Sequence, residues 1–141
     1  PRHRRPRPIP QGTPVSADWV LRHGIILFVE HYDAAVHFYR HILELPLLKD
    51  QGDLVILGFG DGYLMVEREG VAAEMKSRAQ NPTVLRFNVA DVEASAAMLR
   101  DRGVAVSVEA FPWGTVGKFR DPDGNPCELR NHYDGFFAPE R

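Results

Sequence analysis

An internal repeat constrains the fold of this chain more than any other feature of its sequence. The stretch VEHYDAAVHFYR (29–40) matches VADVEASAAMLR (89–100) sixty positions later, and a short apolar run precedes each copy. Further on, GDGYLMVE (60–67) matches DPDGNPCEL (121–129), because both join a turn to a short run that carries a glutamate. Such a period indicates one structural unit that occurs twice.

Local signals predict the same order of elements in both copies. Asp33 and Asp91 are of the residue type that caps helices, and apolar residues follow each of them at helical spacing. Pro46 and Gly103 then act as stop signals. Runs with strand character surround the helices: GIILFV (24–29), DLVILGF (53–59), YLMVE (63–67), TVLRFNV (83–89), VAVSVEA (104–110), TVGKFR (115–120) and PCELR (126–130). Each copy is therefore predicted to be strand–helix–strand–strand–strand.

The segment RDPDGNPCELRN (120–131) is similar to the first half of an EF-hand calcium loop. Counted from Asp121, however, the sixth position is Pro126 and the twelfth is His132, where that loop needs a glycine and a glutamate. We therefore interpret DPDG as a turn that leads into the last strand.

Composition excludes several classes of partner. The chain has 141 residues, of which 44% are hydrophobic and 26% charged, as in a globular protein with one domain or two small units that share a core. A net charge of −2 gives no basis for nucleic acid or an anionic membrane as partner, and no apolar run is long enough to span a bilayer. Cys127 is the only cysteine, which favours a reducing compartment, and we expect the cytoplasm.

The repeat and the composition divide the chain into five segments. Residues 1–18 are basic and rich in proline, so we expect a flexible arm, with an arm that grips phosphate as the alternative. The first unit spans residues 19–69, the second spans 83–132, and residues 70–82 link them. Residues 133–141 form a C-terminal tail.

Two phrases carry a resemblance to a known family: ILFVEHYDAAVHFYRHILELPL near the start and PWGTVGKFRDPDGNPCELRN near the end. With these phrases the chain resembles the vicinal oxygen chelate superfamily, which includes glyoxalase I, extradiol dioxygenases and bleomycin-binding proteins. The resemblance implies an α+β fold in which two tandem βαβββ units form curled mixed sheets around a cup-shaped cavity. It also implies that paired units enclose this cavity, either within one chain or across a dimer, and we expect a homodimer.

In the metal enzymes of this superfamily, His or Gln and Glu from the first and last strands of each unit hold a divalent ion. Matched to this sequence, the first-strand places are Gly24 and Val84, and the last-strand places are Glu67 and Glu128. Gly and Val have no donor side chain, so the resemblance implies an incomplete site, and we expect no metal cofactor. His23 neighbours Gly24, but strand parity points it to the opposite face unless a bulge turns it. The alternative is one divalent ion held by His23, Glu67 and Glu128.

Strand parity also predicts the interior of the cup, because alternate residues of a strand face the same side. The candidate ligand-binding residues are Phe28, Tyr63, Met65, Glu67, Arg86, Asn88, Trp113, Glu128 and Arg130. Arginines that pair with the glutamates would withhold them from a metal. Trp113 either offers a flat face to a planar ligand or covers the edge of the core. No catalytic residue is predicted.

The sequence leaves three functions open. The first is a binding protein without a metal, similar to bleomycin-resistance proteins, for a small apolar or aromatic molecule that the arginines would favour as an anion. The second is a divalent-metal-dependent lyase, isomerase or dioxygenase of the glyoxalase type, in which Glu67 or Glu128 ligates the metal or moves a proton. The third is an interaction module whose cup is filled by its own side chains. A shared scaffold does not choose among them, since one fold hosts unrelated chemistries.

Overall fold

A computed structural model describes residues 19–132, and the predicted arm and tail lie outside this range. The first unit contains β1 (Gly24–Phe28), α1 (Tyr32–His37), the π-helical segment η1 (Phe38–Ile42), β2 (Leu47–Asp50), β3 (Leu54–Phe59) and β4 (Gly62–Glu67). The second contains β5 (Leu85–Val89), α2 (Val92–Asp101), β6 (Ser107–Phe111), β7 (Gly114–Arg120) and β8 (Pro126–Asn131). Both units follow the predicted order of elements.

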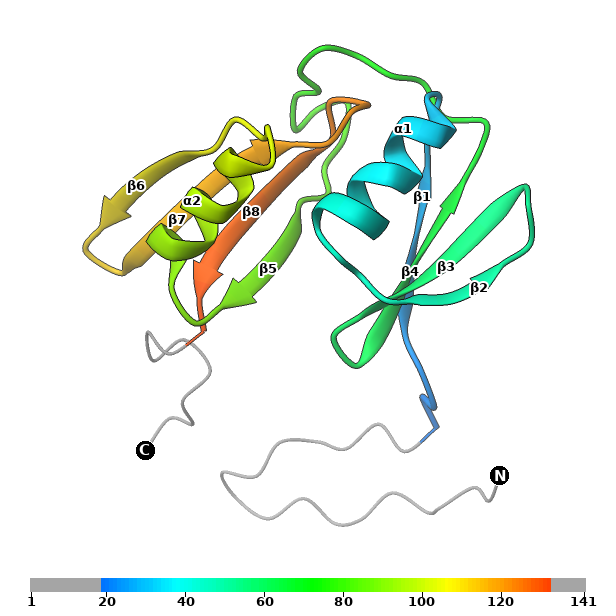
Figure 1. Cartoon of the computed structure of the whole chain (residues 1–141), viewed down its shortest axis with the longest axis horizontal. Coiled ribbons are helices and arrows are strands. Elements are labelled where there is room, and N and C mark those ends of the chain that lie inside the picture. Colours follow the sequence, from blue (N-terminus) through cyan, green and yellow to red (C-terminus); the bar gives the residue numbers. More distant parts are fainter. Residues whose placement is uncertain (1–18, 133–141) are drawn as a thin grey trace.

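Each unit builds one four-stranded mixed sheet. The strand order is β1–β4–β3–β2 in the first sheet and β5–β8–β7–β6 in the second. The first and last strands of each unit run parallel, and the other neighbours are antiparallel. Figure 1 shows the two sheets side by side, with α2 across the second sheet and α1 at the boundary between the units. This architecture confirms the predicted α+β fold of two tandem βαβββ units.

The two helices begin in different ways. Asp91 caps α2 as predicted, and its side chain accepts a hydrogen bond of 3.2 Å from the N–H of Ala94. The predicted cap at Asp33 is wrong, because the helix begins earlier: His31 is the N-cap residue and Asp33 lies in the first turn. The backbone N–H of His31 donates to the carboxylate of Asp123, at 3.1 Å. A residue from the other unit therefore does what a local cap would do.

The DPDGN turn before β8 joins the second unit to the first. Asp121 is buried, and it accepts hydrogen bonds from Tyr39 Oη at 2.6 Å and from two backbone N–H groups of its own turn at 2.9 Å. The linker is held by the same turn, because Ala73 donates its N–H to the Asp123 carbonyl at 3.1 Å. Lys76 likewise donates its N–H to the carbonyl of Gly124, the next residue of the turn, at 3.2 Å. The predicted turn is thus also the joint between the units.

The two units share one hydrophobic core on their helix-bearing faces. The Phe38 ring of η1 lies 6.1 Å from that of Phe119 on β7, and the Phe59 ring of β3 lies 5.1 Å from that of Phe87 on β5, measured between centroids. Buried side chains of α1 and α2 complete this core. Since the helices cover one face of each sheet, the opposite faces remain open.

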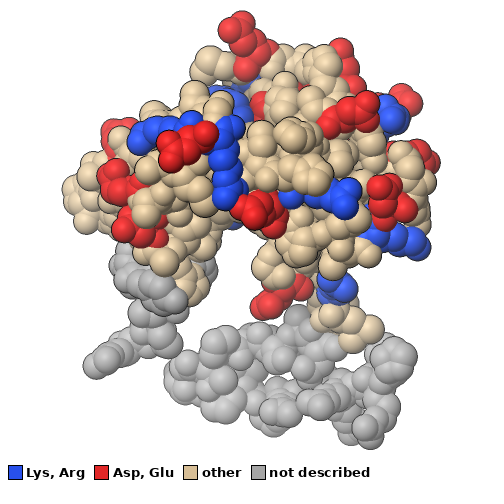
Figure 2. Space-filling view, in the orientation of Figure 1, with Lys and Arg blue, Asp and Glu red and all other residues tan. Residues whose placement is uncertain are grey.

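Acidic and basic side chains are interspersed over the face of the molecule shown in Figure 2. This face therefore has no basic stripe of the kind that follows a nucleic-acid backbone. In the described part of the chain, no helix is both long and apolar enough to cross a membrane.

Candidate ligand-binding site

The residues predicted to line the cup lie on the open faces of the two sheets. On β1 and β4 the neighbouring pairs are Gly24–Tyr63, Ile26–Met65 and Phe28–Glu67. On β5 and β8 they are Arg86–Glu128 and Asn88–Arg130. Strand parity therefore groups these side chains correctly. The pairs on β1 and β4 form what we call the first half-site, and the pairs on β5 and β8 form the second half-site.

The last strands of the two units do not pair in the register that the sequence comparison assumed. In the first unit Ile25 pairs with Leu64, and in the second Leu85 pairs with Cys127. Ile25 and Leu85 occupy equivalent places in the sixty-residue repeat. Leu64 and Cys127 are therefore structural equivalents, although they are sixty-three positions apart in the sequence.

This register corrects the predicted equivalence of Glu67 and Glu128. Counting along each strand from the paired residues, Met65 is the structural counterpart of Glu128. Glu67 is the counterpart of Arg130. Aligning the two glutamates placed β4 two residues out of register, because the pairing of distant strands is not a property of local sequence.

The donor set does not fit a divalent ion. Gly24 has no donor side chain, and Tyr63 lies beside it on β4. A Cβ atom on Gly24 would overlap the Tyr63 ring, so this ring already fills the space of a first-strand ligand. Val84 and Met65 occupy two more of the four places and offer no hard ligand. Glu128 is the one place with a suitable side chain, and a catalytic divalent site usually needs three.

His23 does not complete a metal set. A Cβ atom on Gly62 would lie 2.7 Å from His23 Nε2, so the imidazole lies over Gly62, on the face opposite to Tyr63 and Glu67. Within residues 19–132, no cluster of three or more His, Cys, Asp or Glu side chains could hold a metal. The described residues of one chain therefore do not bring His23, Glu67 and Glu128 together.

The charges of the second half-site are paired with one another. Arg86 Nε donates to Glu128 Oε1 at 2.7 Å, and Nη2 of the same guanidinium donates to the same oxygen. The Glu128 side chain is only 15% exposed, so the pair is partly shielded from water. Such a charge-assisted contact orients both groups and occupies an oxygen that a metal would need.

Arg130 and the aromatic loop form the rest of this half-site. Arg130 is buried, its Nη2 donates to the Trp113 carbonyl at 3.0 Å, and its Cζ lies 4.6 Å from the centre of the Trp113 ring. Phe111 stacks on the same indole, with ring centroids 4.8 Å apart and planes at 3°. Trp113 is nevertheless 54% exposed. A planar ligand that stacks on Trp113 would compete with these two contacts.

Lys118 is a charged residue on the open face of the second sheet that sequence analysis missed. It pairs with Glu128 in the register of β7 and β8, so its side chain shares the open face with Arg86 and Glu128. The alternation within TVGKFR carried the signal, but choosing the face required the register between β7 and β8.

Cys127 belongs to the core. It is buried on the helix side, with Sγ 3.7 Å from Tyr39 Oη. Burial raises the pKa of its thiol to about 12 and, for the same reason, raises the pKa of Tyr39 well above its usual value. A thiol that stays protonated at neutral pH is a poor nucleophile, so Cys127 has no place in a covalent mechanism.

A family comparison now identifies the class of protein. The model described as Glyoxalase/Bleomycin resistance protein/Dioxygenase superfamily matches residues 18–129. The chain belongs to this superfamily. No curated protein matches this superfamily member at a significant level.

Solved structures support the same assignment. The crystal structure of SMU.1112c is 26% identical with a TM-score of 0.68, covering 77% of this chain and 96% of the other. Lactoylglutathione lyase from Agrobacterium tumefaciens is 23% identical with a TM-score of 0.62, covering 80% and 93%. TnmS3, an antibiotic binding protein from Streptomyces sp. CB03234, is 26% identical with a TM-score of 0.57, covering 79% and 96%. A lyase and a binding protein share this fold, so the fold does not choose between the two activities.

Proposed function

We propose that this superfamily member binds a small apolar or aromatic molecule that carries anionic or carbonyl oxygens, without a metal, in a cup that two copies of the chain complete. One observation carries the proposal: the metal places are filled by protein side chains. Tyr63 occupies the space beside Gly24, and Arg86 holds Glu128. Such a pocket can bind and orient a ligand but does not present a set of carboxylate oxygens to a divalent ion.

The chemistry of the two half-sites supports this ligand class. Ile26, Phe28 and Met65 provide an apolar floor on the first sheet. Arg86 and Arg130 provide guanidinium groups on the second, which match carboxylate or carbonyl oxygens. Since the similar protein TnmS3 is named as an antibiotic binding protein, compounds of antibiotic type belong in the first screen.

Exposed apolar area supports a homodimer. Ile26 and Phe28 are 49% and 51% exposed although they lie on sheet strands. Contiguous apolar surface of this kind marks an interaction or ligand site. If the first half-site of one copy faces the second half-site of its partner, a closed two-fold arrangement produces two equivalent cups.

Metal content and ligand screening test this proposal. After incubation with nickel, zinc, iron or manganese and gel filtration, we expect the protein to retain no stoichiometric metal. In a thermal-shift screen, aromatic anions should raise the melting temperature, and Arg86→Gln should reduce this shift while the control Arg40→Gln, on η1, should not. Stoichiometric metal that Glu128→Gln abolishes would overturn the proposal in favour of a metal-dependent lyase, isomerase or dioxygenase. A monomer by light scattering, at all concentrations and with a bound ligand, would overturn the shared cup.

A further inference from the structure

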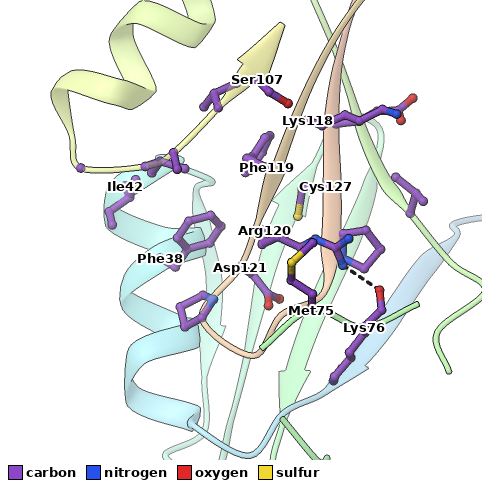
Figure 3. A pocket seen from close by; sticks show the side chains of 18 of the residues that line it. Phe38, Ile42, Met75, Lys76, Ser107, Lys118, Phe119, Arg120, Asp121 and Cys127 are labelled. Carbon is purple, nitrogen blue, oxygen red and sulfur yellow. Dashed lines mark hydrogen bonds between the residues drawn. The ribbon is translucent and has the colours of Figure 1, made fainter. Parts of the chain in front are cut away.

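A second cavity lies on the helix-bearing side of the second unit. It has a volume of about 760 Å³, and Figure 3 shows it between η1, the loop that follows α2, and strands β7 and β8. Phe38, Ile42 and Phe119 form an apolar wall, and Met75 of the linker closes the side near Arg120. A cavity of this size can hold a small organic molecule.

Cationic side chains line this cavity, although the whole chain has a net charge of −2. They are Lys76 and Arg78 from the linker and Arg120 from β7, whereas Lys118 borders the cavity but shares the open face with Glu128. Lys76 Nζ donates to Asn125 Oδ1 at 2.9 Å, and Arg120 Nη1 donates to the Lys76 carbonyl at 2.7 Å. Both acceptors are neutral, so these contacts orient the cations without balancing their charge.

The two acidic side chains of the lining have other partners. Asp121 accepts hydrogen bonds from Tyr39 Oη at 2.6 Å and from Asn125 Nδ2 at 2.8 Å. The Glu128 carboxylate lies on the open face of the sheet, where Arg86 from the neighbouring strand holds it. The cavity thus combines an apolar wall with an excess of positive charge, which disfavours a cation and favours an anion as occupant.

We propose that this cavity is a second binding site, entered from the helix-bearing side of the sheet and bordering the cup at Val84 and Glu128, for a small amphipathic anion with one acidic group on an apolar ring or chain. The apolar part would lie against Phe38, Ile42 and Phe119, and the acidic group would meet Lys76 and Arg120 at the rim. Because the walls come from both units and the linker, an occupant stabilises the arrangement of the units by binding only the folded chain. The proposal does not depend on which ligand the cup takes.

An NMR titration of the full chain with 8-anilinonaphthalene-1-sulfonate, an aromatic sulfonate, tests the site directly. We expect the amide signals of Ile42, Ala105 and Ser107 to shift, whether or not those of Arg86 and Asn88 in the cup also respond. N-phenyl-1-naphthylamine, the uncharged analogue, should shift the same amides but bind with an affinity at least about tenfold lower, since it lacks the charge-assisted contacts.

Variants separate this site from the cup. Ile42→Trp fills the cavity and should abolish the shifts of Ala105 and Ser107, whereas Asn88→Ala in the cup, outside the cavity lining, should leave them unchanged. If Ile42→Trp does not fold, Lys76→Gln serves instead, because it should weaken sulfonate binding without affecting the neutral probe. The proposal is overturned if the sulfonate shifts only cup residues, if it shifts none, or if both probes bind the cavity equally well. A failure of the cup to bind any ligand leaves this readout intact.

Discussion

Tyr39 Oη in the first unit donates a hydrogen bond of 2.6 Å to Asp121 Oδ2 in the second unit. Both side chains are buried, so neither group can exchange this partner for water. The bond connects η1 to the turn that leads into β8, the strand that carries Glu128 and Arg130. The placement of the second half-site relative to the first therefore depends on a contact at the centre of the molecule.

Replacing Tyr39 by Phe removes the hydroxyl and deprives a buried carboxylate of one of its donors. We expect the free energy of unfolding to fall by about 1–3 kcal/mol, measured by urea denaturation. Tyr63→Phe is the matched control, because that ring lies on the open face of the sheet, and it should change stability by less than about 0.5 kcal/mol. Equal losses in the two variants would contradict a special role for the Tyr39 contact.

Asp123 should hold the start of the first helix in place. Its carboxylate accepts hydrogen bonds from the N–H groups of Glu30, at 2.6 Å, and of His31, at 3.1 Å. In Asp123→Ala we expect the amide hydrogens of Glu30 and His31 to exchange faster and stability to fall by about 2–4 kcal/mol, as two charge-assisted bonds are lost. Asp61→Ala, in the exposed turn between β3 and β4, is the control. Unchanged exchange at both amides would argue against this contact.

The buried thiol of Cys127 predicts a loss of stability at alkaline pH. Its pKa is raised by burial from 9.0 to about 12 in the folded chain, so the unfolded chain ionises first as the pH rises. The free energy of unfolding should therefore decline from about pH 9 towards pH 12, with Tyr39 acting in the same direction. Urea denaturation at a series of pH values should show a shallower decline in Cys127→Ala. If the free energy of unfolding fell equally with pH in the unsubstituted protein and in Cys127→Ala, the thiol would not be protected from ionisation.

Gly24→His should not restore a metal site. The new side chain must displace the Tyr63 ring, so we expect a loss of stability of about 1–3 kcal/mol and no metal retention. The double variant with Tyr63→Ala should recover part of this loss, because it vacates the space. Val84→His is the control, since Val84 is 40% exposed and tolerates a larger residue. Full stability of the single variant would show that Tyr63 does not block the place.

Sequence analysis succeeded where neighbouring residues carry the information. Asp91 caps α2 because its own side chain reaches the N–H of Ala94, three residues away. The prediction of which strand residues share a face was also correct, since side chains alternate along any strand. The same reasoning failed at Asp33, because the first helix is capped from a position ninety-two residues distant from His31.

The sequence by itself determined the repeated unit, the order of its strands and helices, and which strand residues share a face, because these follow from short-range propensity and periodicity. Only the tertiary structure decided the register of β4 on β1, which makes Met65 rather than Glu67 the counterpart of Glu128. It also decided that the Tyr63 ring fills the space beside Gly24. Both depend on which strands pair and in which register. The register is set by side-chain packing between residues far apart in the chain.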